Sequence, residues 1–396
     1  MKNLKTVLSL MLLPLVLGSC VEEFMFENET FEKLLVVDAT LTNEDKFHRI
    51  KLSETFPFGN DNENPLQGAT VTVDANGSTL TFEETEPGTY QATTSFSALP
   101  DVAYRLQITL ANGKQYQSSV EQLTPPASID NLYGEREVSE GSDGVSILIN
   151  STGSQSGGSY YRYEYIETFR LDAPLWRTQE AYVVENNFPN CIVDLRPRST
   201  DEITCYRTEV SRDNPLAATS DLTQNTLERF QVNFLPVTSY KIGYRYSVLV
   251  RQLVQTEQAY NYFKVINSFS SDTNLFSQVQ AGFIAGNIQA MQSEEEKVVG
   301  YFGVSSVAEE RIFFNFRDFF PTEPFPPYIV DCELRAPEAI LEDRCGPLVT
   351  NIDSYSYVRP HLGEFPLSTG PYIVALRACG YCTVVGSNEV AEFWVE

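Results

Sequence analysis

The sequence of 396 residues predicts an all-β protein built from tandem β-sandwiches with one embedded helix. Short runs of alternating apolar and polar residues recur along most of the chain, as they do in half-buried strands. Asn-Gly and Pro-Gly pairs separate many of these runs, and such pairs are typical of tight turns between antiparallel strands. Only residues 255–271 repeat their apolar positions at a helical period.

Residues 33–124 are expected to form the first sandwich. Alternating runs flank Asn76-Gly77 and again Asn112-Gly113, and each pair predicts a hairpin, the first with a type I′ turn. Pro87-Gly88 adds a further turn, which brings the segment to about seven short strands at the spacing of a sandwich. Thr124-Pro125-Pro126 ends the alternation, and a pair of prolines indicates a stiff linker between two all-β modules.

Residues 127–396 are expected to form a second all-β region. The run Tyr160–Tyr165 predicts a strand whose tyrosines either present their rings to a ligand, as in carbohydrate sites, or pack half in the core and half in a cross-strand ladder; the second arrangement is the commoner one. Residues 172–214 read as a long excursion, a kind of loop that is often functional. The helix at 255–271 has Thr256 in position to cap its start.

Residues 1–19 have the layout of a lipoprotein signal peptide. Two lysines precede an apolar run, and Leu17-Gly18-Ser19 leads directly to Cys20. A thiol at this position is acylated and becomes the first residue of the mature chain, so lipid at Cys20 is expected to hold the protein on its membrane. The apolar run is shorter than the roughly 20 residues that a spanning helix needs. Residues 20–32 follow as a lipidated acidic tether.

The charge of the chain argues against nucleic acid as a partner. The sequence has 28 basic and 53 acidic residues, a net charge of −25, and removal of residues 1–19 takes away two further lysines. Such a chain is repelled by phosphates and by anionic lipid headgroups, so we expect the folded body to stand off the membrane. The acidity serves either solubility alone or the attraction of cationic ligands.

The cysteines predict disulfides in the second half of the chain. One of the seven, Cys20, is assigned to lipid, and an even remainder in an exported chain indicates disulfide bonds. Proximity favours a bond between Cys191 and Cys205, whereas the last four can pair in any of three ways. The first 190 residues must then rely on core packing. The disulfide candidates are Cys191, Cys205, Cys332, Cys345, Cys379 and Cys382.

Two other interpretations of these cysteines are less favoured. Cys379-Gly380-Tyr381-Cys382 has the spacing of a dithiol redox motif, but that chemistry needs the start of a helix, and residues 372–376 and 383–385 both read as strands. A zinc site made from the last four cysteines has knuckle spacing in only one pair, and the compartment is oxidising. We therefore expect no metal and no cofactor.

The sequence contains no catalytic signature. It lacks a nucleophile elbow, a zinc-protease motif, a dinucleotide fingerprint and a phosphate loop, and its two histidines are His48 and His361. A pair of glycosidase carboxylates stays open, because so many acidic residues supply candidate pairs in any fold. Asp61, Asn62 and Glu63 lie in a loop that either holds calcium or is simply solvated.

Several sequence blocks occur in a fixed order along the chain. They are the lipobox, Pro87-Gly88-Thr89-Tyr90, the tyrosine strand, Gln258–Phe263, Ala285-Gly286-Asn287-Ile288, Val299-Gly300-Tyr301-Phe302 and the terminal Cys-x-x-Cys followed by Phe393-Trp394. Together these blocks resemble a Bacteroidota outer-membrane lipoprotein family that is known only as domain of unknown function 4249. The first sandwich also resembles carboxypeptidase-regulatory and transthyretin-like modules, and the middle of the chain resembles an immunoglobulin-like or fibronectin type III sandwich.

The resemblance implies an accessory lipoprotein of a SusC-like TonB-dependent transporter. On this view the chain is a non-catalytic, surface-exposed outer-membrane lipoprotein that captures a ligand or forms a lid over a TonB-dependent barrel protein. Glu22-Glu23 is similar to the acidic signal that directs such lipoproteins to the cell surface. The alternative is a structural, adhesive or assembly subunit of a cell-envelope complex. Neither the ligand nor any catalytic residue follows from the resemblance.

Overall fold

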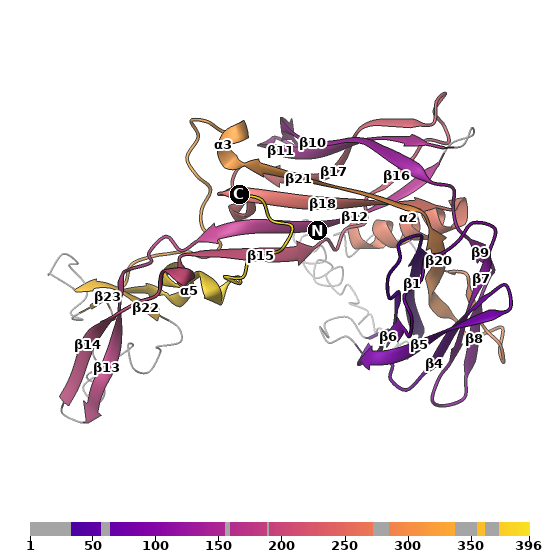
Figure 1. Cartoon of the computed structure of the whole chain (residues 1–396), viewed down its shortest axis with the longest axis horizontal. Helices are drawn as coiled ribbons and strands as arrows, with labels where there is room; N and C mark the ends of the chain where they lie inside the picture. Colours follow the sequence, from indigo (N-terminus) through magenta and orange to yellow (C-terminus); the bar gives the residue numbers. More distant parts are fainter. Residues whose placement is uncertain are drawn as a thin grey trace, which may run out of the picture.

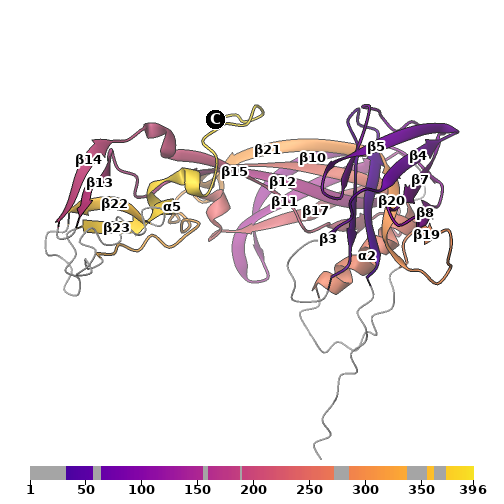
Figure 2. The same ribbon diagram turned by 90° about the horizontal axis from the view of Figure 1, so that it is seen from below.

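The computed structural model describes residues 33–56, 64–154, 159–187, 190–271, 285–336, 355–360 and 372–396. These residues form an all-β body of three parts in a row, which we call the N-terminal sandwich, the central sandwich and the distal region (Figure 1). The distal region lies at the opposite end of the central sandwich from the N-terminal sandwich (Figure 2). The predicted fold class, β-sandwiches with few helices, is confirmed.

The N-terminal sandwich is a single curved sheet whose strands follow the order β19-β8-β7-β4-β5-β6-β2-β1-β20, with β3 beside β2 and β9 beside β7. Alternate residues of each strand enter its core, as Tyr104, Leu106 and Ile108 do from β7. The strands are β1 (Leu35–Thr42), β2 (Arg49–Glu54), β3 (Asn64–Pro65), β4 (Thr70–Ala75), β5 (Ser78–Glu86), β6 (Thr89–Ala92), β7 (Ala103–Thr109), β8 (Gln115–Ser118), β9 (Glu121–Gln122), β19 (Ile288–Ala290) and β20 (Val298–Ser305).

Both predicted hairpins of the N-terminal sandwich are confirmed. Asn76 and Gly77 have φ angles of 50° and 86°, as a two-residue type I′ turn between β4 and β5 requires. The second turn is longer, because Leu110 N donates to Lys114 O at 2.9 Å and only then does β8 pair with β7. Gly113, and not its neighbour Asn112, takes the positive φ angle there.

Two strands of the N-terminal sandwich come from the second half of the chain. β20 runs parallel to β1, with Leu35 opposite Val298, and β19 pairs with β8. The predicted division into 33–124 and 127–396 therefore assigns β19 and β20 to the wrong part of the molecule. Parallel strands need a long crossover connection, so nothing in the local pattern indicates which sheet such a strand joins.

The central sandwich packs the sheet β10-β11-β17 on the sheet β15-β12-β18-β21. Tyr161 and Tyr163 of β12 are fully buried between the two sheets, which confirms the structural interpretation of the tyrosine strand. Its strands are β10 (Ala127–Ser139), β11 (Ser142–Gly153), β12 (Tyr160–Asp172), β15 (Thr204–Val210), β16 (Leu216–Ala218), β17 (Thr226–Pro236), β18 (Arg245–Gln255) and β21 (Val307–Asn315), followed by the short helix α3 (Phe316–Phe319).

The predicted helix is confirmed as α2 (Glu257–Ser271), and it contacts β12, β16 and β18 of the central sandwich as well as β20 of the N-terminal sandwich. It begins two residues later than predicted because residue 255 still belongs to β18. Thr256 caps it as expected, since its Oγ1 accepts from Ala259 N at 3.2 Å.

The distal region contains two small hairpins and short helical turns, so the excursion predicted at 172–214 is largely ordered strand. Residues 383–385, predicted as a strand, instead overlap a 3-10 turn at Cys382–Val384. One hairpin pairs β13 (Gln179–Asn187) with β14 (Asn190–Pro197), and the other pairs β22 (Tyr355–Pro360) with β23 (Tyr372–Leu376). The helical turns of this region are Thr200–Glu202 and α5 (Arg377–Gly380). A further 3-10 turn, Tyr240–Ile242, belongs to the central sandwich and precedes β18.

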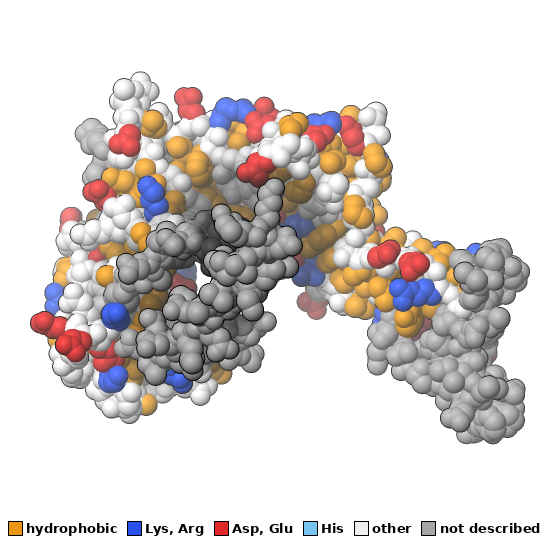
Figure 3. Space-filling model, turned by 180° about the vertical axis from the view of Figure 1, so that it is seen from behind, with side chains coloured by type: hydrophobic (Ala, Val, Ile, Leu, Met, Phe, Trp, Pro, Cys, Tyr) orange, Lys and Arg blue, Asp and Glu red, His pale blue; other side chains and the backbone are white. Residues whose placement is uncertain are grey.

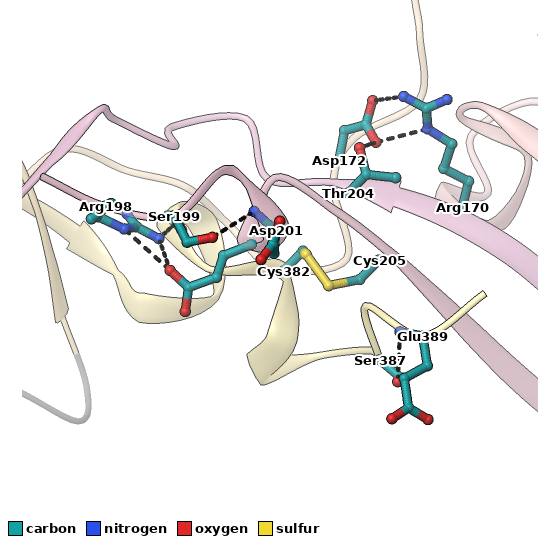
Figure 4. Close-up of a disulfide and its surroundings, with 12 residues drawn as sticks. Arg170, Asp172, Arg198, Ser199, Asp201, Thr204, Cys205, Cys382, Ser387 and Glu389 are labelled. Atoms are coloured by element: carbon teal, nitrogen blue, oxygen red, sulfur yellow. Dashed lines mark hydrogen bonds and ion pairs between the residues drawn. A yellow bond between two sulfur atoms is a disulfide. The ribbon is translucent and has the colours of Figure 1, made fainter.

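One disulfide joins Cys205 of β15, in the central sandwich, to Cys382 of the distal region (Figure 4). A second joins Cys332 to Cys379 within the distal region. The predicted bond between Cys191 and Cys205 is wrong. The C-terminal part of the chain returns beside β15, where Tyr206 pairs with Ser387, and this places Cys382, 177 residues away in sequence, next to Cys205. The two cysteines of the Cys-x-x-Cys motif bond to different partners, so the redox and zinc interpretations are also wrong. The side chain of Cys191 and the whole of Cys345 lie outside the described residues.

Candidate functional site

Two adjoining cavities of about 510 and 580 Å³ lie between the N-terminal and central sandwiches. We call them together the inter-sandwich cleft. One wall is the outward face of β1, β2 and β20, and the other is formed by β12, β18 and α2. Figure 3 shows the molecule from behind, with the N-terminal sandwich at lower left and the central sandwich above it. Both cavities are lined by Asp38, Lys51, Arg162, Glu164 and Arg251.

The first wall follows from strand alternation in β1 and β2. Apolar residues at every second position enter the core, so the polar residues between them face outward toward the cleft. Asp38 and Lys51 stand directly opposite each other in the β1–β2 register. Within the part of the chain that the structure describes, Lys51 forms no ion pair, although it borders both cavities. Its ammonium group is therefore available to a ligand.

The second wall follows from the same alternation in β12. Tyr161, Tyr163 and their neighbours enter the central core, which leaves Arg162 and Glu164 on the opposite face. Glu164 lies opposite Arg251 of β18, and the two side chains form an ion pair at 2.8 Å.

Arg251 also ties the two walls together. Its guanidinium group lies 2.6 Å from the carboxylate of Glu44 in the N-terminal sandwich and 3.5 Å from that of Glu309 in β21. Burial tends to raise the pKa of Glu44, but hydrogen bonds from Lys46 and Thr42 and the charge of Arg251 outweigh it and lower that pKa. Arg251 is thus engaged by three carboxylates and serves mainly to fix the geometry of the cleft.

Arg162 is the most buried cation of the cleft, with only 7% of its side chain exposed. One terminal nitrogen lies 3.0 Å from Glu164, and the guanidinium carbon lies 4.3 Å from the centre of the Phe263 ring. Its Nε has no hydrogen-bond partner among the described residues. A buried donor without a partner is costly, so an incoming acceptor would be well placed to satisfy it.

An apolar surface adjoins these charges. Tyr262, Phe263 and Ile266 line the cleft from α2, and Val299 and Tyr301 line it from β20. The Tyr262 ring lies 5.7 Å from the Tyr301 ring and 5.4 Å from the Phe263 ring, measured between centroids. Burial raises the pKa of both tyrosines to about 12, so both hydroxyl groups stay protonated at neutral pH.

The charge of the cleft is opposite to that of the chain. Its lining contains five basic side chains against two acidic ones, Asp38 and Glu164. Burial, followed by the charge of Lys46, lowers the pKa of His48 to about 4, so this lining residue is neutral at pH 7. Glu44 and Glu309 lie behind this lining and pair with Lys46 and Arg251. In a chain of net charge −25, the cationic excess of the cleft therefore rests mainly on Arg49 and Lys51. The basic residues are Lys46, Arg49, Lys51, Arg162 and Arg251.

The spacing of the two walls is fixed by the junction next to the predicted proline linker. Thr124 Oγ1 donates to Val254 O at 3.0 Å and accepts from Ser306 N at 2.9 Å, which joins the ends of three strands. Val307 N also donates to Asn43 Oδ1 at 2.8 Å. These bonds connect the N-terminal sandwich to the central one beside the cleft.

Two blocks of the resemblance prove to be structural support for β20. Asn287 Nδ2 donates to Ser119 Oγ, Glu121 Oε1 and Phe302 O, each at 2.9 Å. A Cβ atom at Gly300 would lie only 2.2 Å from Val37 O, so glycine is required where β20 approaches β1. The Gly-Asn and Val-Gly blocks therefore hold the strand that carries one edge of the cleft.

Of the chemically reactive residues considered in the sequence analysis, His48 lines the cleft, whereas the lipidation, disulfide and calcium candidates do not meet there. The described disulfide cysteines lie in the distal region or, in the case of Cys205, in the strand β15 that adjoins it, away from the cleft. Cys20, His361 and the calcium candidates Asp61, Asn62 and Glu63 lie outside the described residues. Sequence reasoning missed Lys51, Arg162 and Arg251, whose only signal is a basic residue within a strand of an acidic chain.

The described residues contain no cluster of three or more His, Cys, Asp or Glu side chains arranged to hold a metal ion. Within the same residues, no helix has the length and apolar character needed to cross a bilayer.

A protein-family model described as "Domain of unknown function (DUF4249)" matches residues 21–311. The chain belongs to this family. The match includes every residue named in the cleft, so both walls of the cleft belong to the DUF4249 domain.

Other comparisons add little to the family assignment. No curated protein matches the sequence. Among solved structures, the chain is similar to a crystal structure of a DUF4785 family protein from Legionella pneumophila, with 10% identity and a TM-score of 0.17. That alignment covers 55% of this chain and spans about half, 50%, of the Legionella chain.

Proposed function

We propose that this DUF4249 member is a surface-exposed outer-membrane lipoprotein that serves as a non-catalytic ligand-binding accessory subunit of a TonB-dependent transporter. The observation that carries the ligand-binding part is the inter-sandwich cleft, a concave site with convergent polar groups beside an apolar surface. The lipobox ending at Cys20 and the acidic pair Glu22-Glu23 support attachment at the outer membrane and display outside the cell.

Binding without catalysis is favoured by the state of the polar groups in the cleft. His48 is neutral and its Nε2 is hydrogen-bonded to Phe96 O at 3.0 Å, so it is poorly placed to relay protons. Glu164 is shared between Arg162 and Arg251. Cations and donors fixed in this way suit recognition of a ligand more than proton transfer.

A structural or assembly role in a cell-envelope complex is the second candidate. It is favoured by the arrangement of three parts in a row, which places the disulfide-linked distal region far from the N-terminal sandwich (Figure 2). In this role the distal region would be the contact surface and the sandwiches would act as spacers.

The proposal is tested by purifying the native lipoprotein through a C-terminal tag from detergent-solubilised outer membranes. We expect a TonB-dependent barrel protein to be recovered with it in comparable amount, and we expect protease added to intact cells to cleave the chain. Cys20→Ala serves as the control, because without the lipid anchor the chain should leave the membrane fraction. Recovery of the lipoprotein alone would contradict the transporter role.

A further inference from the structure

We infer that the inter-sandwich cleft binds an organic anion, a molecule with a carboxylate or phosphate head and an aromatic or otherwise apolar body. This inference rests on the proposed function in one respect, the assignment of the cleft as the ligand site. It adds the chemical class of the ligand, and neither family membership nor the sequence indicates that class.

The first step of the argument is that not all cations of the cleft are used by the fold. Arg251 already forms ion pairs with three carboxylates of the protein, so its charge is used by the fold. Lys51 has no ion pair within the described residues, and Arg49 uses its Nε only for the amide oxygen of Gln91, at 3.0 Å. Two cations on the N-terminal wall are thus available to an anion.

The second step is that the opposite wall supplies a buried donor. Arg162 is more than nine-tenths buried, and its Nε lacks a partner among the described residues. Guanidinium and ammonium groups make charge-assisted hydrogen bonds to carboxylate and phosphate oxygens that are about twice as strong as neutral ones. An oxyanion held between the two walls would therefore accept a hydrogen bond from the buried, unpaired Nε of Arg162 and would also pair with the ammonium group of Lys51.

The third step concerns the body of the ligand. Tyr262, Phe263 and Ile266 of α2 stand beside the charged groups on the same cavity wall. The Phe263 ring is already in contact with the Arg162 guanidinium group, which places an apolar face next to the anion position. A purely inorganic anion would leave this surface uncovered, so the cleft suits an anion with an apolar part.

The test uses three probes that share one aromatic body, 1-naphthoate, 1-naphthyl phosphate and the neutral 1-naphthamide. Binding of each to the mature lipoprotein in detergent micelles is measured by titration calorimetry, with empty micelles as the blank. We expect at least one anion to bind about tenfold more tightly than 1-naphthamide, and this preference to shrink as salt is added. Equal binding of all three probes, or binding of none, would overturn the inference.

Two charge reversals locate the binding. Lys51→Glu should weaken binding of the anions by about tenfold and leave that of 1-naphthamide nearly unchanged, because the side chain is exposed and unpaired. Arg177→Glu makes the same change of charge on an exposed residue of the distal region and should change neither. Unchanged anion binding in Lys51→Glu would overturn the assignment to the cleft.

The two anions identify the head group. Tighter binding of 1-naphthyl phosphate assigns a phosphate ligand, and tighter binding of 1-naphthoate assigns a carboxylate ligand. The outcome is independent of the partner experiment. If a transporter is recovered but no anion binds, the accessory role is supported and this inference is overturned. If an anion binds but no transporter is recovered, this inference is supported and the accessory role is contradicted.

Discussion

The N-terminal sandwich and the distal region reach a stable fold by different means. The N-terminal sandwich has a core of 20 buried apolar residues from both halves of the chain and contains no cysteine. The distal region and its junction with β15 have two small buried clusters, one of five residues that includes Cys379 and one of three residues that includes Cys205 and Cys382. Packing suffices where the core is large, whereas small cores need covalent links. The cleft lies beside the N-terminal sandwich, which is held by packing, and far from the disulfide-linked distal region.

The largest difference in stability between the two regions should come from removing the disulfide that closes the longer stretch of chain, Cys205–Cys382. The double substitution Cys205→Ala and Cys382→Ala frees two segments 177 residues apart, which should destabilise the distal region by about 4 kcal/mol. Limited proteolysis should then cut near β13 and β14 while the N-terminal sandwich stays intact. Equal loss of resistance in both regions would show that they do not fold independently.

The converse substitution lies in the N-terminal core. Leu106 of β7 is fully buried, so Leu106→Ala should lower the free energy of unfolding of this sandwich by about 3 kcal/mol. The neighbouring Gln107 is exposed, and Gln107→Ala provides the control in a urea unfolding series. Addition of a reductant should not change the difference between the two variants. A dependence on reductant would mean that the disulfides also support this sandwich.

Acid should also act selectively on the N-terminal sandwich. Burial, and then the charge of Lys46, lower the pKa of His48 from 6.5 to about 4, and the residue is 1% exposed. Between these values the unfolded chain binds more protons than the folded one, so stability is complete above pH 6.5 and falls as the pH drops toward 4. The loss should be roughly 2 to 3 kcal/mol.

His48→Gln keeps a polar group near Phe96 O and removes the titration. The difference in unfolding free energy between wild type and this variant should therefore change with pH over the same range, while other acids titrate equally in both. A constant difference would contradict a buried neutral histidine.

The smallest effect should come from the ion pair between the sandwiches. A double-mutant cycle of Arg251→Gln and Glu44→Gln should give a coupling energy of about 1 kcal/mol, because both side chains are largely shielded from solvent. The more exposed pair of Lys33 and Glu54, at 3.4 Å, should give a coupling close to zero. Equal couplings would mean that Arg251 does not tie the walls of the cleft.

The sequence predicted what short-range rules determine. The turn at Asn76-Gly77 needs two positive φ angles, and Thr256 needs only a free amide three residues ahead, so both were visible in the local pattern. The tyrosine strand was interpreted correctly for the same reason, since alternation alone sends Tyr161 and Tyr163 to one face.

Long-range pairing was beyond these rules. The parallel partner of β1 lies more than 250 residues away in sequence, and Cys205 bonds to a cysteine 177 residues away. The cleft shares this property, because Lys51 and Arg162 belong to different sandwiches and converge only when both have folded and docked. Its positive lining is also hidden in a composition dominated by acids.

Hydrogen exchange of the mature lipoprotein, with and without 1-naphthyl phosphate or 1-naphthoate, tests the cleft most directly. If the cleft is the functional site, the tighter of the two anions should slow amide exchange in β2, in β12 and in α2, because these elements carry Lys51, Arg162 and Phe263. Exchange in β13 and β14 of the distal region should stay unchanged. Slower exchange confined to the distal hairpins, or no change in either region, would contradict the assignment.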